Sequence, residues 1–147
     1  MKKVFLPDSE ATERFGEKFS RILKPGDIVK ITGSLGAGKT TLVRGLVGGL
    51  GGDAAEVHSP TFSLVHEYES LVAPIIHCDF YRLSSNSGLE EFGGAEFFEE
   101  EKIYFIEWPD QIRLPNLPIS RRSIDVHLET DATGRSITFS ASLKIVD

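Results

Sequence analysis

Eight consecutive residues near the start of the chain combine three glycines with a lysine and a threonine: Gly33, Ser34, Leu35, Gly36, Ala37, Gly38, Lys39 and Thr40. Two glycines separated by four residues and followed by Lys and then Ser or Thr form the pattern of a phosphate-binding loop, or P-loop. Glycine permits backbone angles that side chains forbid, and it leaves room for a phosphate to approach closely. Successive backbone N–H groups can then hold an anion, while Lys39 reaches the outer phosphates and the Thr40 hydroxyl can ligate magnesium.

The residues on either side of this stretch are those that a P-loop requires. Residues 28–32 form a short β-branched run that predicts a strand. In residues 41–50, the apolar positions 42, 43, 46, 47 and 50 fit one face of a helix. A strand, a glycine loop and a helix in that order would place the phosphate at the positive end of the helix. The alternative, an ordinary glycine-rich turn, does not explain this context.

The remaining pattern predicts an α/β protein of the P-loop NTPase class, with a mainly parallel sheet, helices, and antiparallel strands at the C-terminus. A first strand is expected at residues 4–6. Asp8 or Ser9 is expected to cap a helix whose apolar residues recur as far as position 23. Short helices are expected around residues 89–92. Further strands are expected at residues 62–68, 75–79, 103–107, 123–129 and 135–143, with a hairpin turn at residues 131–134.

Composition limits the classes of function. The 147 residues suit a single domain spanning 1–147, and the net charge of −6 argues against general binding to a nucleic-acid backbone. The single cysteine, Cys78, excludes an internal disulfide and fits a reducing compartment. No apolar run approaches the roughly 18 residues of a membrane span. We therefore expect a soluble cytoplasmic protein.

Two acidic residues, Asp79 and Glu107, each end an apolar strand. Ligands of open α/β sheets bind at the carboxyl ends of strands, so both acids are expected near Lys39 and Thr40; the alternative is a surface acid at each strand end. Thr61 can offer a hydroxyl to a metal or a terminal phosphate, or it can cap a turn. His77, Cys78 and Asp79 cannot all bind one metal ion, because adjacent strand residues face opposite sides of a sheet. The roles of Arg82 and Trp108 stay open at this stage.

Four motifs of the chain together resemble the TsaE (YjeE) family, the bacterial ATPases needed for threonylcarbamoyl-adenosine modification of tRNA. The resemblance covers the chain from Pro7 to the last hairpin. Ser34 and Asp110 stand where other residue types are common in the family. The motifs are residues 33–41, residues 59–62 (Ser-Pro-Thr-Phe), residues 77–83 (His-Cys-Asp-Phe-Tyr-Arg-Leu) and residues 107–109 (Glu-Trp-Pro).

The resemblance implies ATP bound at the loop, from Leu35 to Thr41, and magnesium held by Thr40 and Glu107 with Asp79 close by. By position, Ser9 and Arg135 would close the adenine pocket, and Lys39, Asp79, Glu107 and Thr61 would serve hydrolysis. It also implies partners, the TsaB and TsaD proteins, and an ATPase that is slow until they bind. Two other classes fit the same residues: a P-loop small-molecule kinase, and a nucleotide-dependent switch with negligible turnover.

Overall fold

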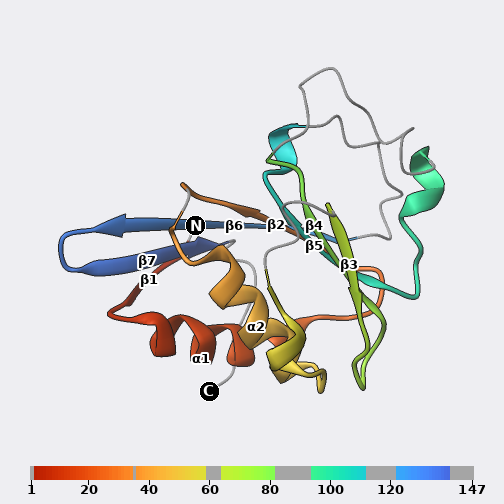
Figure 1. The fold of residues 1–147 in the computed structure, drawn as a ribbon, viewed down its shortest axis with the longest axis horizontal. Coiled ribbons are helices and arrows are strands. Elements are labelled where there is room, and N and C mark those ends of the chain that lie inside the picture. The colour runs from red at the N-terminus through yellow and green to blue at the C-terminus, as the bar shows by residue number, and fades with distance from the viewer. Residues whose placement is uncertain (1, 35, 59–63, 82–93, 112–121, 140–147) are drawn as a thin grey trace.

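The computed structural model describes residues 2–34, 36–58, 64–81, 94–111 and 122–139, and these build one seven-stranded sheet (Figure 1). The order of the strands across the sheet is β1-β7-β6-β2-β5-β4-β3. The strands are β1 (Lys2–Leu6), β2 (Ile28–Thr32), β3 (Val65–Tyr68), β4 (Ile75–Asp79), β5 (Ile103–Glu107), β6 (Ser123–Asp131) and β7 (Gly134–Phe139).

Four neighbouring strands at the centre of the sheet, β6, β2, β5 and β4, run parallel. Antiparallel strands close both sides: β3 pairs with β4, and β7 pairs with β6 and with β1. The parallel arrangement brings the carboxyl ends of β2, β5 and β4 to one edge of the sheet. The predicted fold class, a P-loop NTPase type of α/β protein with a C-terminal antiparallel hairpin, is confirmed.

Two helices, α1 (Ser9–Phe19) and α2 (Lys39–Gly49), pack against each other below the sheet in Figure 1. The larger core lies between these helices and the sheet, and it includes Phe15, Leu42 and Val29. A smaller core on the opposite face gathers around Tyr104 and Ile106. Asp8 caps α1, because its Oδ1 accepts the Ala11 N–H at 2.8 Å.

The element boundaries differ from the sequence prediction at a few places. Helix α2 begins two residues earlier than predicted, at Lys39, directly after the loop. Strand β3 begins at Val65, and residues 62 and 63 of the predicted strand 62–68 lie outside the described residues. The predicted helices at 89–92 and the predicted strand residues 140–143 also lie outside them. Short 3-10 turns occupy Ser20–Ile22, Ala54–Glu56, Gly94–Phe97 and Pro109–Gln111. No helix in the described parts of the chain combines the length and the apolarity needed to cross a membrane.

Candidate functional site

The loop between β2 and α2 needs glycine at both ends. Gly33 has a φ of 144°, and a Cβ there would lie 2.5 Å from the carbonyl oxygen of Leu128. Gly38 has a φ of 100° and precedes the first residue of α2. A side chain at either position would strain the backbone. Leu35 lies outside the described residues, whereas Gly36 and Ala37 belong to the described part of the loop.

Lys39 is the first residue of α2 and is only 5% exposed. Its Nζ donates hydrogen bonds of 2.8 Å to the backbone oxygens of both Gly33 and Ser34. The same ammonium lies 4.6 Å from the centre of the Trp108 ring, in the geometry of a cation–π contact. Burial lowers the pKa of Lys39, while the charges of Glu107 and Asp79 act in the opposite direction. The cation of the loop is therefore held between loop carbonyls, an aromatic face and two acids.

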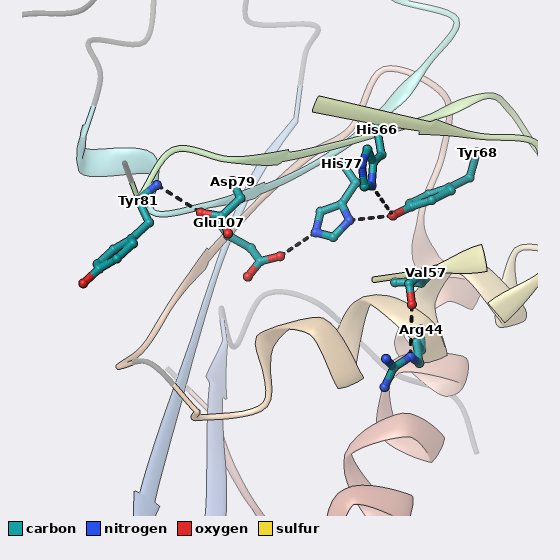
Figure 2. Close-up of polar contacts among 8 residues, drawn as sticks. All are labelled: Arg44, Val57, His66, Tyr68, His77, Asp79, Tyr81 and Glu107. Atoms are coloured by element: carbon teal, nitrogen blue, oxygen red, sulfur yellow. Dashed lines mark hydrogen bonds and ion pairs between the residues drawn. The ribbon is translucent and has the colours of Figure 1, made fainter. Parts of the chain in front are cut away.

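The two strand-end acids lie side by side. Asp79 ends β4 and Glu107 ends β5, and the two residues are direct partners in the parallel register. Glu107 is in turn the register partner of Ile31 in β2, the strand that leads into the loop. Both carboxylates are buried, with exposed fractions of 4% and 3%. The Asp79 Oδ1 accepts the backbone N–H of Tyr81 at 3.0 Å, as Figure 2 shows.

A second group of predicted residues meets at the other side of the loop. The guanidinium of Arg135, at the start of β7, donates from Nη2 to the Ser9 Oγ at 3.2 Å. Its Nη1 lies within 3.5 Å of the Thr12 hydroxyl and 2.9 Å from the position that a Cβ on Gly38 would take. The N-terminal helix, the P-loop and the C-terminal hairpin thus meet at one arginine.

The remaining predicted site residues divide into two sets. Thr40 and Thr41 are the second and third residues of α2, and both are half-buried. Thr61, like Arg82, lies outside the described residues.

Sequence reasoning gave no role to Tyr68, which contacts His77. It interpreted His77 as a polar residue that lines the nucleotide site, and it left Trp108 either to cover the site or to fill the core. The His77 ring lies 2.5 Å from Glu107 and 2.9 Å from the Tyr68 hydroxyl (Figure 2). Trp108 follows Glu107 with a φ of 57°, a left-handed conformation that is unusual for a bulky residue. For His77 a signal did exist, because residues two apart in a strand share a face, and His77 precedes Asp79 by two. Cys78, between them, packs in the opposite core, and burial raises the pKa of its thiol.

The donor set at the loop suits magnesium. Two carboxylates and the Thr40 hydroxyl supply the hard oxygen ligands that Mg²⁺ prefers. Within the described residues, no group of three or more His, Cys, Asp and Glu side chains forms a metal cluster of its own. Magnesium is typically held by one or two carboxylates together with phosphate oxygens and water.

The sheet order and the glycine loop between β2 and α2 define a protein with a P-loop NTPase fold. Residues 6–137 match the family model described as "Threonylcarbamoyl adenosine biosynthesis protein TsaE". The chain belongs to the TsaE family.

Relatives in several organisms agree with this assignment. The "tRNA threonylcarbamoyladenosine biosynthesis protein TsaE" of Synechocystis is 41% identical over 120 residues, which are 79% of this chain and 74% of the relative. The protein of the same name in Bacillus subtilis is 37% identical over 132 residues, covering 90% of this chain and 80% of the relative. Among solved structures, Bacillus subtilis YdiB is similar with a TM-score of 0.67 and 29% identity, over 94% of this chain and 83% of that one.

Proposed function

We propose that this protein is a magnesium-dependent, ATP-binding and ATP-hydrolysing subunit that acts with the TsaB and TsaD proteins in threonylcarbamoyl-adenosine modification of tRNA. The observation that carries the proposal is the position of Lys39, which lies beside two buried strand-end acids at the end of a glycine loop. The names of the relatives place those proteins in the same modification.

In the proposed site, the backbone N–H groups of the loop and the first turn of α2 bind the phosphates of ATP. Lys39 exchanges its bonds to the loop carbonyls for bonds to the outer phosphates. Thr40 and Glu107, with Asp79 beside them, hold the magnesium ion. When bound, magnesium neutralises charge that develops on the terminal phosphates. Ser9 and Arg135 close the side of the site nearest Gly38, where we place the adenosine.

Slow hydrolysis by the isolated chain is part of the proposal. Because both acids are assigned to the cation, another group must orient the attacking water or stabilise the developing charge. Arg82 is our candidate within the chain, and a partner can act on the loop 59–61, which carries Thr61, or supply a group of its own. Missing groups of this kind account for about 10³–10⁵-fold in rate among P-loop hydrolases.

The test is ATP hydrolysis by the purified chain, alone and with TsaB and TsaD. We expect a low rate alone and a clear increase with both partners. The Lys39→Ala variant should lose productive ATP use and keep its fold, judged by circular dichroism. Normal turnover by a folded Lys39→Ala protein would contradict the P-loop assignment. A rate that the partners leave unchanged, together with phosphate transferred to a small molecule, would favour the kinase alternative.

A further inference from the structure

The Glu107 carboxylate is held by a buried side chain that the proposed mechanism has not used. Its Oε2 lies 2.5 Å from the Nε2 of His77, and His77 has no exposed surface. A carboxylate oxygen accepts hydrogen bonds, so the proton between these atoms belongs to the His77 Nε2. This contact is made by Oε2, and the other oxygen, Oε1, can turn toward a cation.

The second nitrogen of the His77 ring faces a tyrosine hydroxyl. The Nδ1 of His77 lies 2.9 Å from the Tyr68 hydroxyl, and Tyr68 is 4% exposed. The next candidate acceptor for the Tyr68 proton, the Nδ1 of His66, lies 3.5 Å away. Burial raises the pKa of Tyr68 to about 12, although a hydrogen bond from the His58 backbone lowers it in part. The phenol is therefore a permanent donor, and its nearest acceptor is His77.

Together these contacts determine which nitrogen of the His77 ring carries the proton. If Tyr68 donates to Nδ1, that nitrogen carries no proton, and the single proton of a neutral imidazole must sit on Nε2. Nε2 then donates to Glu107. The hydrogen-bond partner of a metal-binding side chain typically determines the orientation of that side chain. Loss of such a partner typically costs 10–100-fold in metal affinity.

We propose that His77, fixed in its Nε2–H form by Tyr68, is a positioning residue that orients the Glu107 carboxylate toward the magnesium ion. This inference rests on the proposed function, because it assigns the cation to Glu107. The site then involves three neighbouring strands. Tyr68 of β3, at the edge of the sheet, fixes the ring of His77 in β4, and His77 orients Glu107 in β5.

The proton position on His77 is measured without nucleotide or metal. In ¹⁵N-histidine-labelled protein, the ring nitrogens of His77 can be assigned by comparison with the His77→Gln variant. We expect a protonated Nε2 and an unprotonated Nδ1 in the wild type. In Tyr68→Phe, the Nδ1 resonance should move, because its hydrogen bond is lost. A wild-type ring that carries a proton on Nδ1 would overturn the inference.

The magnesium requirement is measured by titrating ATP binding against magnesium and in EDTA. We expect His77→Asn to need about 10–100-fold more magnesium, with binding in EDTA unchanged. Tyr68→Phe should shift the requirement in the same direction by less. His77→Gln should recover most of the wild-type behaviour, because the amide nitrogen of glutamine can take the place of Nε2, whereas that of asparagine cannot.

The chain offers a matched control in Tyr104→Phe. Tyr104 is also a buried tyrosine, and its hydroxyl donates to the Phe97 oxygen at 2.6 Å in the core on the opposite face of the sheet. This variant should bind magnesium and ATP normally. A normal magnesium requirement in His77→Asn, or equal losses in the Asn and Gln variants, would overturn the inference. A wild type whose ATP binding does not depend on magnesium would overturn the proposed function together with it, and that result is seen before any variant is compared.

Discussion

Asp79 and Glu107 are register partners, and both are buried at the end of the loop that carries Lys39. If they hold the cation, Asp79→Asn and Glu107→Gln should lower ATP hydrolysis by about 10²-fold, a magnitude typical of lost charge stabilisation in a transition state. ADP affinity in EDTA should change little, because the loop backbone and Lys39 bind the phosphates. Phosphate release and ADP titration measure the two effects. Asp125→Asn, an exposed acid of β6, is the control, and wild-type rates in both site variants would exclude these acids from the site.

Tyr68 gives the protein a pH dependence that can be separated from other groups. The folded state keeps the phenol proton to about pH 12, whereas an unfolded tyrosine loses it near pH 10. Between these values the folded state binds more protons, so the free energy of unfolding falls as the pH rises. From pH 8 to 11, the wild type should lose about 1 kcal/mol more than Tyr68→Phe. Urea unfolding at both pH values measures this difference, and equal losses would contradict it.

These residues also show which parts of the site can be predicted from the sequence. Asp79 and Glu107 could be found because an acid after an apolar run marks a strand end, and parallel strands end at one edge. Tyr68 could not, because its contact with His77 depends on the antiparallel register of β3 and β4, where Tyr68 pairs with Ile75. Nothing local in residues 65–68 specifies that register. Arg135 was placed near Ser9 only through family resemblance, since their contact joins positions 126 residues apart.

The backbones of helices α1 and α2 approach each other closely at glycines. A Cβ on Gly45 would lie 2.1 Å from the backbone oxygen of Glu13, so Gly45→Ala must push the helices apart. We expect a loss of about 1–3 kcal/mol in the free energy of unfolding, the usual cost of overpacking. Urea unfolding measures this loss, and a Gly45→Ala protein as stable as the wild type would contradict the close approach.

The control lies one turn further along the same helix. A Cβ on Gly48 would meet only the Ala54 Cβ, at an ordinary 3.6 Å. Gly48→Ala should therefore stabilise the protein by up to about 1 kcal/mol, because alanine favours a helix over glycine. If the two glycine-to-alanine substitutions in α2 change the free energy of unfolding in opposite directions, the effect of helix packing is separated from that of helix propensity.

At the level of elements, local sequence patterns predicted the helices and strands themselves better than their first and last residues. Strand β2 has the predicted bounds, because its β-branched run ends directly at Gly33. Helix α2 begins earlier than its apolar periodicity suggested, because its first two residues, Lys39 and Thr40, are polar. The helix starts directly after Gly38, which has a left-handed conformation. The pairing of β1 with β7 joins the two ends of the described chain, and no local pattern in either strand specifies it.

At the level of the whole molecule, several basic side chains of the described residues are engaged in internal contacts. Arg122 pairs with the buried Asp27, and Arg44 donates to the Val57 oxygen. Lys39 binds the loop and Arg135 binds Ser9, while Lys102 pairs with Glu67 and Glu99. These contacts and the net charge of −6 both oppose binding along a nucleic-acid backbone, because that binding depends on cations that neutralise phosphates.

We accordingly expect the isolated protein to bind tRNA weakly, with a Kd above about 10⁻⁵ M at physiological salt. Any binding should weaken further as salt rises, because it would depend on displacing counterions from phosphates. Fluorescence anisotropy of labelled tRNA over a salt series measures this, with TsaB and TsaD added as the comparison. In the proposed assembly the partners hold the tRNA, so binding should appear with them and not with this chain alone. Tight binding by the isolated chain that salt leaves unchanged would mean that it reads tRNA by direct contacts of its own.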